Sequence, residues 1–177
     1  MCIRDRTKEV SRSHKIDISP SGLISVLGGK WTTYRKIAED ALDKAISINK
    51  LKKKKCKTER TKLFGFKRNV SWSDPMHVYG SLKKKVESLG GINDNKSLSN
   101  KFYISNNIIE WSIIHEMALT VEDILARRTR CVFLDSKESK RIAPIVAQKM
   151  ADVLGEDDKW IDAELKKFNK LIKNYIV

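Results

Sequence analysis

The first part of the chain carries a strand pattern that changes to helical spacing at a pair of glycines. Residues 23–27 form a short apolar run with one polar break at Ser25, and Gly28 and Gly29 close it, as is typical of a buried strand that ends abruptly. From Thr32 to about Asn49, apolar or small residues recur every three or four positions, so an amphipathic helix should follow at once.

A second extended segment precedes this run. Ile16 and Ile18 alternate with polar residues near the end of segment 7–19, and a turn signal follows at residues 20–22. Two strands joined by such a turn would form a hairpin. The sequence therefore predicts a hairpin, a glycine turn and a helix in its first 49 residues.

Helical patterns dominate the rest of the chain. Thr120 is placed to cap a helix, with Asp123 three residues later in the manner of a capping box. Gly155 should stop a later helix, and Asp157 or Asp158 can cap the last one. The expected helices cover approximately residues 77–89, 108–117, 120–132, 142–153 and 158–175.

Composition indicates a folded chain. Hydrophobic residues make up 41% and charged residues 33% of its 177 residues, and the sequence contains neither a membrane-spanning apolar run nor the apolar core of a secretory signal. The three cysteines form no CxxC pair, and the three histidines lack metal-ligand spacing. We expect no metal site, no disulfide framework and a reducing compartment.

The net charge is +14, for which nucleic acid, an anionic membrane surface and phosphorylated substrates are candidate partners. Much of this charge lies in the Lys-rich segment at residues 50–62, which contains no aromatic residue. Because nucleic-acid platforms usually interleave basic and stacking groups, we interpret the segment as a solvated linker. A basic helical module that binds nucleic acid or an anionic membrane is the alternative, and steeply salt-dependent binding would distinguish it.

The glycine turn is suited to an electron-rich ligand. Gly28 and Gly29 have no Cβ atoms to hold a ligand away from the backbone, and the first turn of the following helix offers unpaired N–H groups. Lys30 adds a full positive charge, and the Thr32 and Thr33 hydroxyls can cap the helix or donate to the same ligand. A plain glycine turn with threonine caps is the alternative interpretation.

Two long motifs give this turn a family context. Arg12-x-His14-x-x-Asp17-Ile18, followed by GGKWTTYRK-x-AEDALD, resembles the last βα segment of the FAD domain of FAD-dependent, quinone-linked glycerol-3-phosphate dehydrogenases. EMALTVEDILARRTR at residues 116–130 resembles the signature of the helical C-terminal domain of that family. The resemblance runs from about Ser11 to about Tyr175.

The resemblance implies an α+β fold in which a short β-hairpin and strand–turn–helix remnant of an FAD-binding domain precedes a mostly α-helical C-terminal domain. The implied boundaries are 1–49 for the FAD-domain segment, 50–70 for the linker and 71–177 for the helical domain. No G-x-G-x-x-G dinucleotide fingerprint occurs in the chain. We therefore expect a fragment that is inactive alone and whose partner is the missing N-terminal FAD domain of the same polypeptide.

The implied activity is oxidation of sn-glycerol 3-phosphate to dihydroxyacetone phosphate, with electrons passed through FAD to quinone. The cofactor would face backbone N–H groups at the pyrimidine end of its flavin ring. Lys30 and Arg12 would bind the substrate, and no residue of this chain is expected to be catalytic. The implied cofactor-binding residues are Gly28, Gly29, Lys30, Trp31 and Thr32.

The resemblance also implies a location and a set of contacts. We expect a cytoplasmic protein, peripheral on the cytoplasmic face of the membrane, with an anionic membrane surface as a further contact and no nucleic-acid partner. From the residues themselves, Arg127, Arg128 and Arg130 are expected to form ion pairs with acids such as Glu116, Glu122 or Asp135, and a phosphate or nucleic-acid contact is the alternative.

Overall fold

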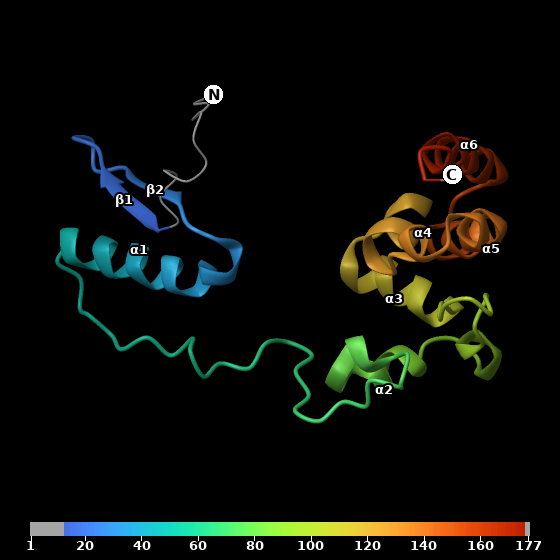
Figure 1. Ribbon diagram of the computed structural model, residues 1–177, viewed down its shortest axis with the longest axis horizontal. Coiled ribbons are helices and arrows are strands. Elements are labelled where there is room, and N and C mark those ends of the chain that lie inside the picture. The colour runs from blue at the N-terminus through green and yellow to red at the C-terminus, as the bar shows by residue number, and fades with distance from the viewer. Residues whose placement is uncertain (1–12, 176–177) are drawn as a thin grey trace. The chain divides into compact units, whose positions relative to one another are not determined.

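The computed structural model describes residues 13–175 and divides the chain into two compact units, Met1–Leu63 and Phe64–Val177. Arg12 lies outside the described residues. Figure 1 shows the hairpin and α1 in the first unit and helices α2 to α6 in the second. The boundary between the units falls within segment 50–70.

The first unit begins with an antiparallel hairpin. Strands β1 (His14–Ile18) and β2 (Ile24–Gly28) pair in a register that places His14 opposite Gly28 and Ile18 opposite Ile24. The turn between them is closed by a hydrogen bond of 3.0 Å from the Ser19 N–H to the Leu23 carbonyl. The predicted hairpin is confirmed.

A helix follows the hairpin without an intervening loop. A 3-10 turn at Trp31–Thr33 leads into α1 (Tyr34–Ile48), which lies along one face of the hairpin in Figure 1. The helical spacing that begins at Thr32 therefore predicts this element to within two residues.

The first unit buries little apolar surface. No residue between 13 and 63 is buried, and Leu23 and Leu42 are 65% and 64% exposed. Because a fully buried leucine contributes about 1.5–3 kcal/mol, most of the possible hydrophobic stabilisation is absent here. The prediction that residues 23–27 form a buried strand is therefore wrong for this chain, since the described residues leave Val26 and Leu27 exposed.

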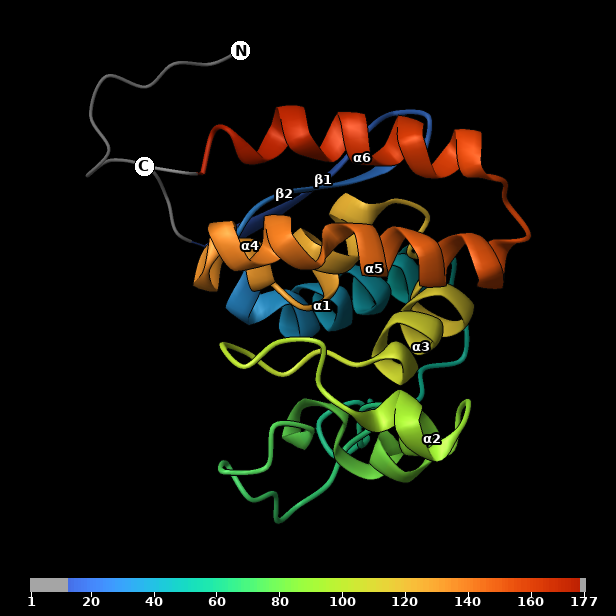
Figure 2. The same cartoon turned by 90° about the vertical axis from the view of Figure 1, so that its right-hand side faces the viewer.

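The second unit contains the hydrophobic core. In Figure 2, α5 and α6 lie side by side, with α3 next to α5. Side chains from these helices form one buried cluster, which includes Ile109, Ile142, Met150 and Phe168. The principal helices of the unit are α2 (Lys83–Glu87), α3 (Asn106–Glu116), α4 (Cys131–Leu134), α5 (Ser136–Leu154) and α6 (Asp158–Ile172).

The helix predicted over residues 77–89 is interrupted. A 3-10 segment at His77–Leu82 precedes α2, and Gly80 within that segment has a φ of 52° and a ψ of −116°. A Cβ atom at Gly80 would overlap the carbonyl oxygen of Gly65. The chain therefore leaves helical geometry where these two backbones meet, and the prediction of one continuous helix is wrong.

The capping box at Thr120 is confirmed. The Thr120 hydroxyl accepts from the Asp123 N–H at 3.1 Å, and the Asp123 carboxylate accepts from the Thr120 N–H at 3.0 Å. The helix then widens into a π-helical turn at Asp123–Arg128, and Arg130 adopts a left-handed conformation before α4 begins. One helix running from Thr120 through Val132 is therefore not formed.

The last two helices end and begin as predicted. Gly155, with a φ of 76°, follows α5, and the Asp157 carboxylate accepts from the Trp160 N–H at 3.0 Å at the start of α6. The architecture is a small hairpin and helix followed by a helical domain. The predicted α+β class is confirmed.

Candidate functional site

Both glycines of the turn adopt backbone conformations that favour glycine. Gly28 and Gly29 have φ angles of 75° and 83°, in the left-handed region where a Cβ atom is unfavourable. A Cβ atom at Gly29 would lie 2.6 Å from Ile37 Cδ1 in α1. Glycine is therefore favoured at this position by the left-handed backbone, and a Cβ atom here would in addition require the Ile37 side chain to shift.

The Thr33 hydroxyl is used within the turn. It donates to the Lys30 carbonyl at 2.9 Å and accepts from the Lys30 N–H at 3.4 Å. The first N–H groups of this turn have no carbonyl one helical turn earlier to accept from them. These backbone N–H groups are therefore the donors with which the turn can bind an anion.

A groove of about 410 Å³ lies beside the turn. It brings together four of the predicted cofactor residues, Gly28, Gly29, Lys30 and Trp31, whereas Thr32 does not line it. Lys30 is exposed, and Trp31, which is 87% exposed, stacks on Tyr34 with ring centroids 5.7 Å apart. The turn is thus accessible to a ligand.

Sequence reasoning missed the helical wall of this groove. Tyr34, Ile37 and Ala41 of α1 also line it. Their spacing of three to four residues from one another and from Trp31 is the signal that could have identified them.

A second groove, of about 480 Å³, runs between the apolar face of α1 and residues 56–63, and Leu42 and Leu63 contribute to it.

An ion-pair network fixes the start of β1 to α1. His14 Nε2 lies 3.1 Å from Asp40, and Lys36 Nζ lies 2.8 Å from the same carboxylate. The hydrogen bond from Lys36, together with the nearby His14, lowers the pKa of Asp40. His14, which belongs to the first motif, thus has a supporting contact next to the glycine turn.

The arginines of the second motif have different environments. Arg127 pairs with Glu122 and, at 2.8 Å, with Asp123, so the expected ion pair with Glu122 is confirmed. Within residues 13–175, Arg128 and Arg130 are exposed and form no ion pair. The other two expected acids have other donors: Glu116 accepts from Trp111 and Asp135 from the Glu138 N–H.

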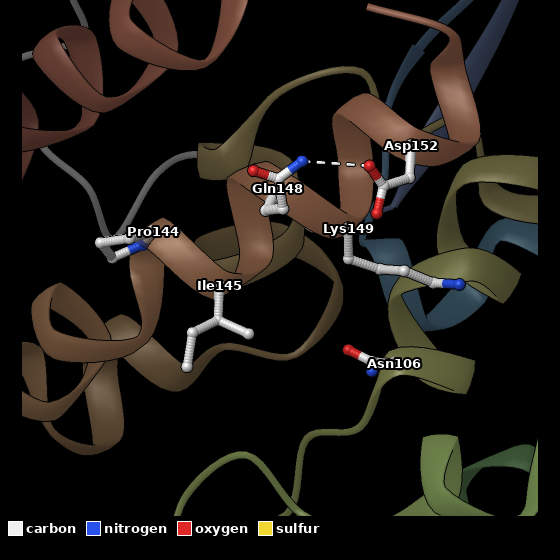
Figure 3. A pocket seen from close by; sticks show the side chains of 6 residues that line it. All are labelled: Asn106, Pro144, Ile145, Gln148, Lys149 and Asp152. Carbon is white, nitrogen blue, oxygen red and sulfur yellow. Dashed lines mark hydrogen bonds between the residues drawn. The ribbon is translucent and has the colours of Figure 1, made fainter. Parts of the chain in front are cut away.

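A shallow depression of about 420 Å³ lies between α3 and α5, and Figure 3 shows Asn106 on one side of it and Ile145, Gln148 and Lys149 of α5 on the other. The Lys149 ammonium binds Glu110 at 2.7 Å, and Gln148 donates to Asp152 at 3.1 Å. Because the one cation lining it is already neutralised, this depression is a poor site for a phosphate group.

The described residues contain neither a metal-binding cluster nor a membrane-spanning helix. Between residues 13 and 175, no group of three or more His, Cys, Asp or Glu side chains is arranged to hold a metal ion. None of the helices in the same range is both long and apolar enough to cross a bilayer.

The structure and the motifs together define a class of protein. Its members combine a glycine turn that has an accessible helix start with a helical domain that carries an arginine-rich signature. A family model described as the C-terminal domain of alpha-glycerophosphate oxidase matches residues 24–161. The chain belongs to this family.

Several relatives are glycerol-3-phosphate dehydrogenases. The mitochondrial enzyme of Bos taurus is 30% identical over 94% of this chain, and the probable mitochondrial enzyme of Dictyostelium discoideum is 31% identical over 96%. Glycerol-3-phosphate dehydrogenase 1 of Mycobacterium tuberculosis is 33% identical over 82%. The matched segment spans 26%, 29% and 30% of these three relatives, respectively.

Proposed function

We propose that this chain is the C-terminal part of a flavoprotein dehydrogenase that oxidises sn-glycerol 3-phosphate to dihydroxyacetone phosphate and passes electrons through FAD to quinone. The groove beside the glycine turn carries this proposal, because it combines an exposed lysine with an accessible helix start in a chain of this family. Relatives that are named glycerol-3-phosphate dehydrogenase support glycerol 3-phosphate as the substrate.

The residues of the turn fit a flavin. A planar, electron-rich ring needs an accessible surface and donors for its negative charge, and the turn offers Gly28 and Gly29 in the lining of the groove together with a helix N-terminus. FAD, when bound, would accept a hydride from the secondary alcohol of the substrate and deliver the electrons to quinone. The backbone N–H groups from Gly29 to Thr32 would orient the ring and stabilise charge on it.

Lys30 would act on both ligands. Its ammonium is exposed beside the groove, where a positive charge favours both a phosphate and an electron-rich ring. Trp31 and Tyr34 would exclude water from one side of the bound ring. Arg12, which precedes the described residues, is proposed as a phosphate ligand because guanidinium matches phosphate geometry.

We further propose that residues 1–49 are the last segment of an FAD-binding domain and that residues 50–70 link this segment to the helical domain at 71–177. The rest of the FAD domain, N-terminal in the same polypeptide, is the proposed main partner. The exposed apolar residues of the first unit support this proposal, because a folded domain normally covers such a surface. The proposed location is peripheral, on the cytoplasmic face of the membrane.

The test compares this chain with the polypeptide encoded by its complete reading frame. The 177-residue chain should be colourless and show no dye reduction with glycerol 3-phosphate, whereas the complete polypeptide should be yellow and active. A complete polypeptide that contains no flavin would contradict the proposal.

A further inference from the structure

A pocket in the second unit is lined by no residue of the glycine turn and has no part in the proposed flavin chemistry. Its volume is about 290 Å³, and it lies against the 3-10 segment His77–Leu82 and the C-terminal end of α3. Its lining combines aromatic rings with one carboxylate: Phe64, Tyr79, Trp111, His115 and Glu116.

Glu116 is partly buried and has no counter-ion. Its Oε1 atom accepts from Trp111 Nε1 at 3.0 Å. In the part of the chain that the structure describes, no Lys, Arg or His nitrogen pairs with it, although the net charge of the chain is +14. A partly buried carboxylate with no cationic partner among the described residues has the capacity to accept a cation.

The rings around Glu116 also suit a cation. Phe64, which is 86% exposed, is the open ring of the lining, whereas Trp111 is 5% exposed and has the His115 ring against it, with centroids 4.0 Å apart. Burial of Tyr79, together with the nearby Glu116, raises the pKa of its phenol, which therefore stays a neutral hydroxyl. Faces of neutral aromatic rings attract ammonium and guanidinium groups.

The walls of the pocket are fixed by backbone contacts. The Ser81 N–H donates to the Gly65 carbonyl at 3.0 Å, and Gly80 allows this close approach because it has no side chain. The loop that carries Phe64 is thus attached to the turn that carries Tyr79. The pocket is formed before a ligand arrives, which reduces the entropic cost of binding.

We propose that this pocket binds the guanidinium group of an arginine side chain presented by another polypeptide segment. Guanidinium is favoured over other cations because it is planar, stacks on aromatic rings and donates several hydrogen bonds to a carboxylate. A quaternary ammonium, such as a choline headgroup, has no N–H to donate to Glu116 or Tyr79. The relatives carry about 70% or more of their length outside the matched segment, which provides polypeptide that could present the arginine.

The experiment follows the indole N–H signal of Trp111 by NMR in the ¹⁵N-labelled 177-residue chain. The probes are N-acetylarginine amide, N-acetyllysine amide and choline, each at constant ionic strength. The arginine probe should give a saturable shift of the Trp111 signal with an affinity several-fold higher than that of the other two. No saturable shift, or tighter binding of choline, would overturn the proposal, and the second result would assign the pocket to a lipid headgroup.

Glu116→Gln supplies the matched variant, since its amide oxygen can still accept from Trp111 while the charge is lost. Affinity for the arginine probe should fall at least about tenfold. Glu156→Gln makes the same charge change at an exposed site outside the pocket and should leave the affinity unchanged. Equal losses in both variants would contradict the proposal. If Glu116→Gln does not fold, Tyr79→Phe serves instead, with an expected loss of at least about twofold.

Discussion

At the residue scale, Asp123 organises the start of the arginine-rich motif. Its carboxylate accepts from the N–H groups of Leu119 and Thr120, from the Thr120 hydroxyl and from Arg127. Burial acts to raise the pKa of Asp123, but the hydrogen bonds from Leu119 and Thr120 outweigh it and lower the pKa. One side chain thus satisfies several donors of the turn between α3 and the π-helical segment.

Replacing Asp123 should therefore destabilise the second unit. Asp123→Asn removes the charge and part of the acceptor capacity, so the free energy of unfolding should fall by about 1–3 kcal/mol. Denaturant unfolding followed by circular dichroism measures the change. Asp162→Asn, at an exposed position in α6, should change the free energy by less than about 0.5 kcal/mol. Equal effects of the two substitutions would contradict the role of Asp123.

The environment of Glu138 predicts that the free energy of unfolding depends on pH. Hydrogen bonds from Arg141 and Ser99 lower the pKa of Glu138 from 4.5 to about 2. Because the folded state holds the ionised form, the stabilising contribution is fully present above the ordinary pKa and is lost as the pH falls through the folded one. The difference in unfolding free energy between wild type and Glu138→Gln should therefore be constant near neutral pH and shrink between about pH 4.5 and about pH 2. A difference that does not change with pH would contradict this assignment.

The sequence predicts some of these contacts and not others. Thr120 and Asp123 are recognisable because a capping box has a fixed spacing of three residues. Glu122 is among the acids expected to pair with Arg127, and Asp123 lies four residues before Arg127, a spacing that also favours an ion pair. Within residues 13–175, Arg128 and Arg130 form no ion pair; their side-chain directions follow from the π-helical turn and the left-handed backbone of Arg130, which spacing alone does not predict.

At the element scale, the contact between Gly29 and Ile37 joins the hairpin to α1. Gly22 has a similar φ of 84° but nothing within 4 Å of its Cβ position. Substitution of Gly22 therefore measures the cost of a left-handed backbone alone, whereas substitution of Gly29 measures that cost together with the cost of the steric contact with Ile37.

Gly29→Ala should loosen α1 more than Gly22→Ala does. Both substitutions place a Cβ atom in the left-handed region, at about 1–2 kcal/mol each. Only Gly29→Ala also displaces the Ile37 side chain, which adds about 0.5–1.5 kcal/mol. Amide hydrogen exchange of α1 measures the difference.

The double substitution Gly29→Ala with Ile37→Ala provides the control, because it removes the clashing Cδ1 atom. Relative to Ile37→Ala alone, its additional effect on exchange should approach that of Gly22→Ala. If that additional effect remains as large as that of Gly29→Ala in the wild-type background, the contact with Ile37 is not the cause.

Helix spacing predicts elements well where contacts are local. It identifies α1, α3, α5 and α6, because apolar positions recur at helical spacing within each of them. It fails at residues 77–89 because the interruption at Gly80 depends on Gly65, which is distant in sequence and close in space. The groove beside Gly29 is partly predictable, since the glycine pair is visible in the sequence and its helical wall is not.

At the scale of the whole molecule, the two units differ in how much apolar surface they bury. Residues 13–63 contain no buried residue, whereas the second unit has two buried apolar clusters. Local stability depends on buried apolar contacts. The first unit should consequently open more readily than the second.

Amide hydrogen exchange of the 177-residue chain tests this difference. Amides of α5 and α6 should exchange on the order of a hundredfold more slowly than those of α1. In the complete polypeptide, the FAD domain should cover the apolar surface of the first unit and slow exchange in α1. Equal protection of α1, α5 and α6 in the isolated chain would contradict the account of burial.

The most direct measurement of the central claim is the flavin midpoint potential of the complete polypeptide, with Lys30→Ala compared with Lys44→Ala. Lys44 is an exposed lysine of α1 with no ion pair among the described residues, and it does not line the groove. If the turn faces the flavin, loss of the Lys30 charge should lower the potential by on the order of 10–30 mV, because negative charge gained on reduction is less stabilised. Lys44→Ala should leave it unchanged, and identical potentials in the two variants would contradict the claim.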